Sequence, residues 1–279
     1  MEQYTLANGV QIPAIGLGTW QTPDDEIGYQ AVLSALQLGY RHIDTAQGYR
    51  NEDIVGRAVK DSGIPREEIF ITSKLDNPNH GYDNTMRSFE GTLEQLGTDY
   101  VDLFLIHWPN PLQYRETWQQ TNAETWNAFE ELYHAGKIKA IGVSNFRQHH
   151  IDEIMKTAEI APMVNQIRLC PGETQDELAA YCKERNILLE AYSPLGTGQI
   201  FKVPEMQALA EKYQKSIAQI CIRWSLQMGF LPLPKSVTAE RIRENMDVFG
   251  FELSEDDVKL IAGLTGCVGL SKDPDTINW

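Results

Sequence analysis

The chain has 279 residues, of which 42% are hydrophobic and 23% are charged, and its formal net charge is -15 at pH 7. This is the composition of a folded protein with a large core. The acidic balance argues against a protein that binds nucleic acid or an anionic membrane, because both need a basic surface.

Two chain-wide signals bear on location. The N-terminus lacks a basic region followed by an apolar stretch, and no apolar run approaches the length of a membrane span. The four cysteines form no C-x-x-C pair and have no zinc-like spacing, which is typical of reduced thiols in a cytosolic protein. We therefore expect a cytoplasmic monomer with no nucleic-acid partner and no membrane partner.

In chain order, the first predicted element is a small hairpin whose turn is "ANG" at 7–9. After it, strand-like apolar runs recur along the whole sequence. They span 14–20, 42–46, 69–75, 101–108, 140–146, 163–169, 188–195 and 230–236. The middles of these runs are continuously apolar rather than alternating, which indicates parallel strands covered on both faces.

Amphipathic stretches between the runs read as helices. Those at 24–39, 83–97 and 122–136 begin with acidic or capping residues and stop at a glycine. Eight strands alternating with helices, in a chain of this length, favour a single α/β domain over 1–279, a (β/α)8 TIM barrel, over a doubly wound sheet. In such a barrel the active site lies at the C-terminal ends of the strands.

Polar residues stand where the predicted strands end. Asp44, Lys74 and His107 end the second, third and fourth runs, and Tyr49 follows Asp44 in the next loop. Each alone has an ordinary structural explanation, such as a cap or a satisfied core histidine. Four acid–base side chains at one end of a barrel instead indicate a catalytic group.

This group suits proton donation to a polarised oxygen. A free tyrosine, with a pKa of about 10, is a weak acid at neutral pH, and a nearby ammonium lowers that pKa. We expect Lys74 to supply the charge to Tyr49 and Asp44 to keep the lysine protonated. A neutral His107 would orient a carbonyl and stabilise the developing oxyanion. The chemistry is carbonyl reduction, which needs a hydride source.

A nucleotide cofactor must be held without a Rossmann fingerprint, because Gln21 replaces the third glycine after "GLGTW". The stretch "PKSVTAERIREN" (234–245) instead offers Lys235, Ser236 and Arg241 around a helix that Thr238 would cap. Cations at a helix N-terminus after strand 8 predict a phosphate site, and an arginine there suggests the phosphomonoester of NADP. Other polar residues near strand ends match the remaining parts of a dinucleotide: Tyr192 for stacking on nicotinamide, Ser144, Asn145 and Gln166 for its carboxamide, and Glu244 and Asn245 for the adenine edge.

With these residues in place, the chain resembles the aldo-keto reductases over nearly its whole length. "GLGTW", "RHIDTAQGYRNE", "ITSKL", "LIHWP", "IGVSNF", "VNQ", "AYSPLG" and "PKSVTAERIREN" occur in the order of that family. The resemblance implies NADPH-dependent reduction of aldehydes or ketones, with Tyr49 as general acid, Lys74 and Asp44 tuning it and His107 orienting the carbonyl. It also implies contacts to NADPH or NADP by Thr19, Asp44, Ser144, Asn145, Gln166, Tyr192, Ser193, Leu195, Thr197, Lys235, Ser236, Val237, Arg241, Glu244 and Asn245.

Two departures stand out from the family pattern. Arg168 and Cys170 follow "VNQ", where many members have a glutamate and then His-Pro. The loops at 109–121 and 265–279 are short, which resembles the compact microbial branch that includes reductases of diketogluconate and methylglyoxal.

The predicted carbonyl pocket is lined by aromatic residues around one polar point. Trp20, Tyr49, His107 and Trp108 form it, with contributions from the loop at 110–118 and from Trp279. Such walls suit small aldehydes, ketones or keto sugars without selecting one.

Two other functions remain open from the sequence. "GVSNF" nearly matches a hydrolase nucleophile elbow at Ser144, although Phe146 takes the place of the closing glycine. An NADP-binding regulatory subunit is the second. His149 and His150 are expected to face different directions, exposed to solvent, and to form no metal site.

Overall fold

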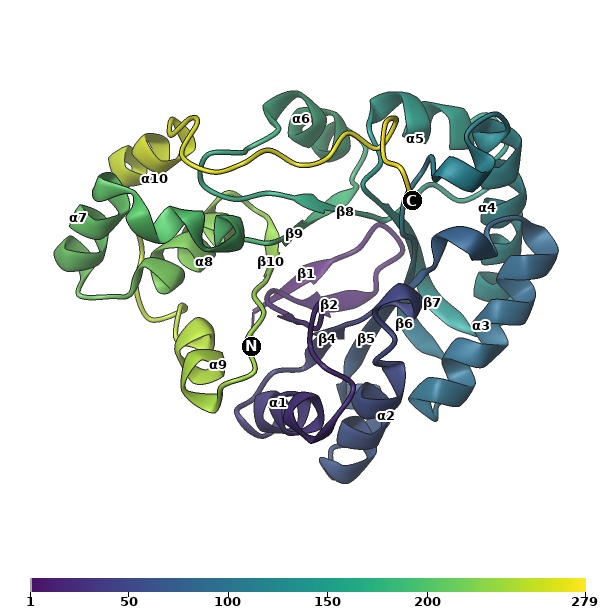
Figure 1. Cartoon of the computed structure of the whole chain (residues 1–279), viewed down its shortest axis with the longest axis horizontal. Coiled ribbons are helices and arrows are strands. Elements are labelled where there is room, and N and C mark those ends of the chain that lie inside the picture. The colour runs from purple at the N-terminus through teal and green to yellow at the C-terminus, as the bar shows by residue number, and fades with distance from the viewer. Residues whose placement is uncertain (1) are drawn as a thin grey trace.

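Eight parallel strands form the centre of the molecule in the computed structural model, which describes residues 2–279 (Figure 1). They pair in sequential order, as the barrel prediction requires. The strands are β3 (Leu17–Gly18), β4 (His42–Asp44), β5 (Phe70–Leu75), β6 (Val101–Ile106), β7 (Ile138–Ser144), β8 (Val164–Arg168), β9 (Leu188–Tyr192) and β10 (Leu231–Leu233).

Helices surround this sheet on its outer side, as Figure 1 shows. They are α1 (Glu26–Gln37), α2 (Glu52–Asp61), α3 (Tyr82–Leu96), α4 (Trp118–His134), α5 (Gln148–Ile154), α6 (Asp176–Glu184), α7 (Pro204–Tyr213), α8 (Ile217–Gln227), α9 (Ala239–Met246) and α10 (Glu255–Ala262). Every residue of β5 and β6 is buried, because helices cover one face and the barrel interior the other. This explains the continuously apolar runs of the sequence.

The seam between β3 and β10 closes the barrel and is its least regular part. The first run, expected over 14–20, pairs with β4 at only two residues. Across the seam, the N–H groups of Gly16 and Gly18 donate to the carbonyls of Pro232 (3.2 Å) and Pro234 (3.0 Å). Proline has no N–H to donate in return, so the ladder here is one-sided and both strands are shorter than predicted.

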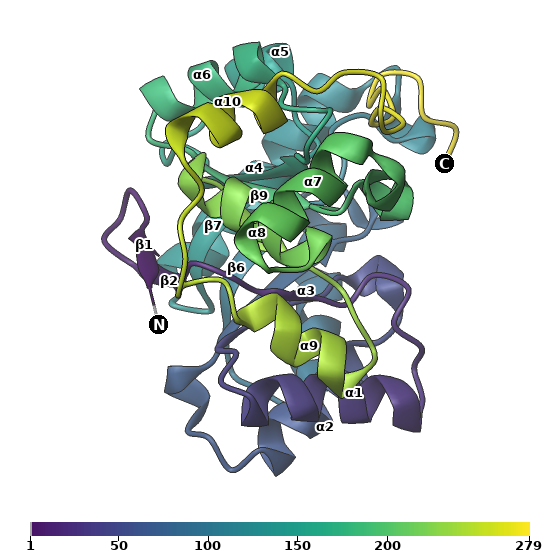
Figure 2. The same cartoon turned by 90° about the vertical axis from the view of Figure 1, so that its left-hand side faces the viewer.

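The predicted N-terminal hairpin is present. β1 (Gln3–Thr5) pairs antiparallel with β2 (Gln11–Pro13), and Gly9 supplies the positive φ of 88° that the turn needs. Leu6 and Ile12 are buried beneath it. In Figure 2 the hairpin projects at one end of the barrel and the C-terminus lies on the opposite side.

Helix ends follow the predicted signals at α1 and α3, whereas α4 begins earlier than expected. The Asp25 side chain accepts the N–H groups of Ile27 and Gly28 at the start of α1, and Gly97 ends α3 with φ of 60°. Helix α4, expected from residue 122, begins at Trp118. The Trp118 indole packs edge-on against His150, with ring centroids 5.0 Å apart, which favours an earlier start.

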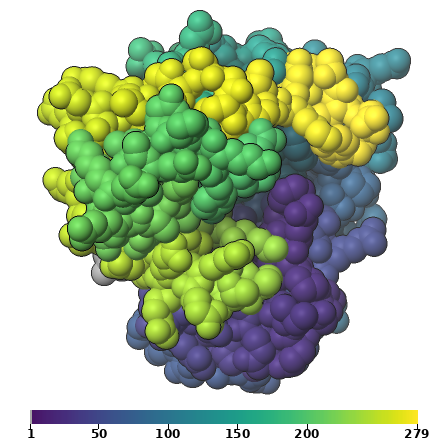
Figure 3. Space-filling view, turned by 60° about the vertical axis from the view of Figure 1, so that its left-hand side comes forward, coloured from purple at the N-terminus to yellow at the C-terminus, as the bar shows by residue number. Residues whose placement is uncertain are grey.

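A C-terminal tail, residues 263–279, contains no helix or strand and runs across the molecule beside α5 and α6 (Figures 1 and 2). In the space-filling view of Figure 3, the tail is yellow and lies along the top of the molecule, next to the green residues around position 200. Arg168 holds it through the carbonyl of Gly269, and Trp279 accepts the N–H of Leu112 at 3.0 Å. One replaced family position, Arg168, therefore serves to anchor this tail.

Two other expectations concern the whole chain. All four cysteines, Cys170, Cys182, Cys221 and Cys267, are free thiols. Among residues 2–279, no helix combines the length and the apolar character that crossing a bilayer requires.

Candidate active site

A buried ion pair lies at the C-terminal ends of β4 and β5. Lys74 Nζ donates to both carboxylate oxygens of Asp44 at 2.8 Å and to the carbonyl of Thr45 at 2.7 Å. Burial lowers the pKa of Lys74, but the negative charge and the hydrogen bonds of Asp44 oppose this effect, and the net direction of the pKa is upward. The lysine therefore remains a cation inside the barrel.

Tyr49 and His107 complete a cluster of four around this pair. The Tyr49 ring centroid is 4.8 Å from Lys74 Nζ and 5.5 Å from the His107 ring, which meets it edge-on. Tyr49 lies in the short 3-10 helix η1 (Gln47–Tyr49), and the Gln47 amide bonds both to Asp76 N–H and to Thr92 Oγ1. The predicted meeting of four side chains from separate segments is therefore present in the structure.

One electrostatic expectation about Tyr49 is wrong. Burial raises the pKa of its phenol, Lys74 lowers it, and burial is the stronger effect, so the pKa lies above its usual value. The cation therefore offsets only part of the desolvation cost. Tyr49 is fully protonated at neutral pH, as a proton donor must be.

His107 is neutral at physiological pH. Burial, followed by the positive charge of Lys74, lowers the pKa of His107 well below its usual value. A neutral imidazole carries one N–H, so it retains a single donor for an oxygen ligand.

Polar groups of β7, β8 and β9 lie beside the cluster. Ser144 Oγ donates to the carbonyl of Gln166 (2.8 Å), and Asn145 accepts the Tyr192 hydroxyl (2.8 Å) while its amide donates to the carbonyl of His107 (3.0 Å). Ser144 makes no hydrogen bond to a histidine within residues 2–279, so the hydrolase hypothesis lacks its nucleophile–base pair.

Glu190 is the site residue that the sequence interpretation missed. It is fully buried on β9, directly opposite Gln166 of β8 in the strand register. The amide nitrogen of Gln166 donates both to Glu190 Oε2 (2.7 Å) and to Asp44 Oδ1 (2.8 Å). The signal was an acidic residue inside the apolar run "LLEAY", two positions before Tyr192 and so on the same face of the strand.

Beyond β9 the backbone is irregular. Ser193 and Thr197 have positive φ values of 50° and 53°, and Thr197 Oγ1 donates to the carbonyl of Gly196 (2.7 Å). Leu195 precedes the 3-10 segment η5 (Gly196–Lys202). Thr19, also expected at the site, is buried and uses its hydroxyl on the carbonyl of Asp44 (2.9 Å).

The predicted phosphate site lies after β10, at the start of α9. Lys235 and Arg241 are exposed, and within residues 2–279 neither forms an ion pair. Thr238 occupies the N-cap position, but its hydroxyl lies 3.2 Å from Ser236 Oγ and does not cap the helix, contrary to expectation. The first N–H groups of α9 therefore have no side-chain cap. Of the other predicted contacts here, Val237 and Glu244 are half-buried and Asn245 is buried.

Two tryptophans of the predicted pocket contact each other. Trp108 follows His107 directly, and its ring meets that of Trp279 edge-on at 5.7 Å. Lys272 Nζ lies 4.1 Å from the centroid of the Trp279 ring, and Trp20 is 52% exposed. The C-terminal tail thus brings a tryptophan to the predicted pocket.

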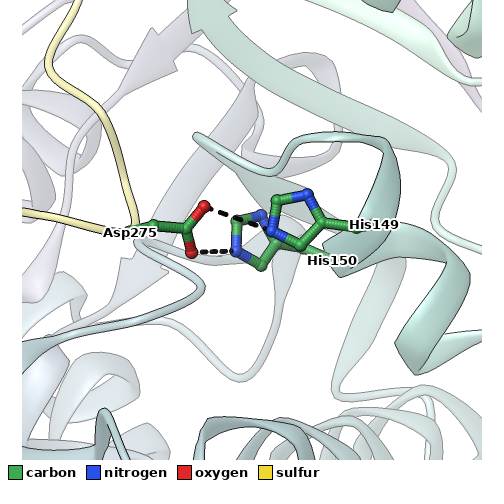
Figure 4. Close-up of side chains that lie close together, drawn as sticks. All are labelled: His149, His150 and Asp275. Carbon is green, nitrogen blue, oxygen red and sulfur yellow. Dashed lines mark hydrogen bonds and ion pairs between the residues drawn. The ribbon is translucent and has the colours of Figure 1, made fainter.

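The expectation for the adjacent histidines is wrong in part: His149 is exposed as expected, but the two rings do not face different directions. His150 is buried, and both rings turn toward Asp275 of the tail, with Nε2 to carboxylate distances of 3.2 Å for His149 and 2.9 Å for His150 (Figure 4). His150 Nδ1 accepts the backbone N–H of Arg147 (3.1 Å), so its Nε2 carries the hydrogen. A metal ligand needs a lone pair at that nitrogen, so this group acts as a clamp on the tail.

Comparison with known proteins settles the family. The model of the "Aldo/keto reductase family" matches residues 14–265. The chain belongs to the aldo/keto reductase family.

Among curated aldo/keto reductases and related enzymes, the glyoxal reductase of Bacillus subtilis (strain 168) is 47% identical to this chain. The match covers 98% of this chain and 96% of that protein. A 9,11-endoperoxide prostaglandin H2 reductase of Trypanosoma cruzi (strain CL Brener) is 43% identical, with 97% and 94% covered.

Solved aldo/keto reductase structures share the fold. MGS-M4, from a Medee basin deep-sea metagenome library, superposes with a TM-score of 0.93 at 45% identity and covers 99% of this chain and 100% of its own. A variant of Gox0644 in complex with NADPH gives a TM-score of 0.92 at 39% identity, with 100% and 99% covered. As a member of this family the protein is an NADP-dependent oxidoreductase that reduces carbonyl groups.

Proposed function

We propose that this enzyme reduces small aldehydes, ketones and keto sugars, and that Tyr49 donates the proton. One observation carries the proposal: a lysine fixed by Asp44 lies 4.8 Å from the ring of a protonated tyrosine, beside a neutral histidine. These are the groups that a carbonyl oxygen needs as it takes on negative charge.

NADPH, when bound, supplies the hydride. The chain has unsatisfied groups that fit it: the unpaired cations Lys235 and Arg241, the uncapped start of α9, and Gln166 Oε1, which has no partner among residues 2–279. Cations at a helix N-terminus suit a phosphate, and an amide oxygen suits the carboxamide N–H of nicotinamide. The remaining proposed contacts are Thr19, Asp44, Ser144, Asn145, Tyr192, Ser193, Leu195, Thr197, Ser236, Val237, Glu244 and Asn245.

Each catalytic residue then has one task. His107 donates its N–H to the carbonyl oxygen and fixes its position. Tyr49 transfers its phenolic proton to that oxygen as negative charge develops there. Lys74 stabilises the phenolate left behind until a proton from solvent restores it, and Asp44 keeps Lys74 charged and aimed.

The substrate proposal rests on the pocket and on one relative. In this proposal Trp20, Trp108 and Trp279 provide the aromatic surface of the pocket; Trp108 directly follows His107 and contacts Trp279, and Trp20 is exposed. The glyoxal reductase of B. subtilis is 47% identical over nearly the whole chain. We therefore favour small dicarbonyl compounds within the wider class.

The whole chain is proposed to act as one catalytic unit in the cytoplasm. Strands from residue 17 to residue 233 join one sheet, and tail residues up to Trp279 contact the site. Four free thiols suit a reducing compartment.

The test mixes the enzyme with NADPH and a panel of glyoxal, methylglyoxal, simple aldehydes and keto sugars, and follows nicotinamide absorbance. A reductase consumes NADPH with at least one of these carbonyls. Binding of NADPH without turnover of any of them would instead support a regulatory subunit. Hydrolysis of an ester panel without NADPH would support a hydrolase.

A further inference from the structure

Glu190 is a buried carboxyl for which the proposed mechanism has no task. It lies in the middle of β9, with no exposed surface, and its register neighbours are Gln166 on β8 and Leu231 on β10. A carboxyl in such a place costs free energy that a leucine would not, because its polar atoms lose water.

The contacts of Glu190 lead directly to the active site. Gln166 has one amide nitrogen with two hydrogens, and it gives one to Glu190 Oε2 (2.7 Å) and the other to Asp44 Oδ1 (2.8 Å). With both hydrogens engaged, the amide plane is fixed and Gln166 Oε1 is the only polar atom of that side chain left for a ligand. The same Asp44 oxygen accepts Lys74 Nζ.

Within residues 2–279, no cation forms an ion pair with Glu190. Its second oxygen, Oε1, has no hydrogen-bond partner within residues 2–279, and the nearest basic atom is His42 Nε2 at 3.9 Å. His42 shares that nitrogen with Thr72 Oγ1 (2.9 Å), and burial lowers its pKa to about 3, so it is neutral. Lys74 is paired with Asp44. Burial, aided by the charge of Asp44, raises the pKa of Glu190 to about 8, so the carboxyl holds its proton at neutral pH.

We propose that Glu190 is a positioning residue: its carboxyl holds the second amide hydrogen of Gln166, which keeps Gln166 Oε1 toward the cofactor and Asp44 on Lys74. This inference rests on the proposed function, in which Gln166 receives the nicotinamide carboxamide. The neutrality matters because a second carboxylate beside Asp44 would oppose the formation of a Tyr49 phenolate. The ionisable groups facing Glu190 are His42 and Asp44 of β4 and Lys74 of β5, which are not paired with β9 and reach it through the barrel interior.

The experiment compares Glu190→Leu with Glu190→Gln. Leucine fills a similar volume but accepts no hydrogen bond, whereas glutamine is neutral and retains an acceptor oxygen for Gln166. We expect Glu190→Leu to raise the Kd and KM for NADPH about tenfold, the effect of freeing one positioned hydrogen bond, while KM for the carbonyl stays unchanged. Glu190→Gln should bind NADPH within about twofold of the wild type.

Two controls keep the result interpretable. Glu130→Gln changes another buried glutamate, one that accepts the N–H groups of Glu159 and Ile160 on the outside of the barrel, and should alter neither constant. Glu190→Gln preserves both shape and neutrality, so it tests the proposal even if the leucine variant does not fold. Unchanged NADPH binding in Glu190→Leu, or a tenfold loss in Glu190→Gln, would overturn it.

A Gln166→Ala variant separates this inference from the proposed function. Weak NADPH binding in Gln166→Ala with normal binding in Glu190→Leu would refute only the role of Glu190. Normal binding in Gln166→Ala would show that Gln166 does not contact the cofactor, and both the placement and the inference would fall.

Discussion

The acid–base cluster and the predicted phosphate site differ in whether their cations already have partners within the protein. Lys74 is sealed in the barrel with three hydrogen bonds from its ammonium, and Asp44 accepts from both Lys74 and Gln166. Lys235 and Arg241, in contrast, are exposed and without an ion-pair partner within residues 2–279.

The difference reflects the two tasks of these groups, which are catalysis and anion binding. Groups that stabilise a developing charge gain from being fixed beforehand in a dry interior, where electrostatic effects are strong. Groups that grip an anion gain from staying free until it arrives, because pre-existing carboxylate partners would compete with it. In a chain of net charge -15, two free cations at one helix start form a local exception that favours an anionic ligand.

Removing the interior cation should give the largest effect. Lys74→Met leaves Asp44 as an unpaired buried charge, which should cost about 3–5 kcal/mol of unfolding free energy, measured by urea denaturation. It should also lower kcat about a thousandfold, because the phenolate of Tyr49 loses its stabilising charge.

Lys139→Met is the matched control for this change. Lys139 pairs with Asp102 at 3.1 Å, but its side chain is 40% exposed and lies at the other end of the strands. Asp102 is buried but keeps a second pair with Arg66 at 2.8 Å, so the loss of the exposed lysine should cost only about 0–1 kcal/mol and leave kcat close to that of the wild type. Comparable losses in the two variants would mean that the buried pair has no special role.

Removing the exposed cation Arg241 should change cofactor binding alone. Arg241→Ala should raise the Kd for NADPH about tenfold to a hundredfold and leave that for NADH nearly unchanged, because only NADPH carries the extra phosphate. Fluorescence titration at low and high salt measures this. Arg243→Ala, also exposed on α9, is the control. Equal weakening of NADPH and NADH in Arg241→Ala would place the phosphate elsewhere.

The tail clamp gives a smaller, pocket-specific effect. Asp275→Ala removes the acceptor of both His149 and His150, so Trp279 should lose its fixed position beside Trp108. We expect KM for the carbonyl to rise about threefold to tenfold, with no change in the Kd for NADPH. Glu153→Ala breaks a solvent-exposed pair with Lys156, next to α5, the helix that carries the two histidines, and should have little effect. A larger KM change in the control would show that the clamp does not hold the pocket.

The pH dependence of stability tests the sealed interior from another direction. The raised pKa of Glu190, about 8, means that between its unfolded value of about 4.5 and pH 8 the native state holds a proton that the unfolded state releases. Wild-type stability therefore falls with rising pH through this window, by about 1.4 kcal/mol per unit for this group. From pH 5.5 to 7.5, Glu190→Gln should gain about 2.5 kcal/mol relative to the wild type in urea unfolding. A constant difference would show that Glu190 is ionised in the native state.

The sequence was sufficient for features fixed by periodicity and strand ends. Continuous apolar runs predicted eight parallel strands, and because such strands end at one face of a barrel, Asp44, Lys74 and His107 were expected together. The seam shortened by Pro232 and Pro234 was harder to foresee, since strand length there depends on which neighbour the prolines meet.

Two kinds of information were absent from sequence patterns. The clamp joins His150 to Asp275, 125 residues away, and no local period indicates a contact between a helix and an irregular tail. The pKa of Tyr49 depends on whether burial or Lys74 has the larger effect, a question of magnitude that residue identities leave open. Glu190 was visible as an acid in an apolar run, and only its neighbours revealed a connection to Asp44 through Gln166.

The central claim is that Tyr49 gives its proton to the substrate oxygen with Lys74 beside it, and Tyr49→Phe tests this most directly. In Tyr49→Phe, single-turnover oxidation of bound NADPH by glyoxal should slow about a thousandfold, while the Kd for NADPH stays within about twofold of the wild type. The control is Tyr133→Phe, a change near the N-terminal hairpin, which should behave as the wild type. Near-normal turnover in Tyr49→Phe would contradict the account.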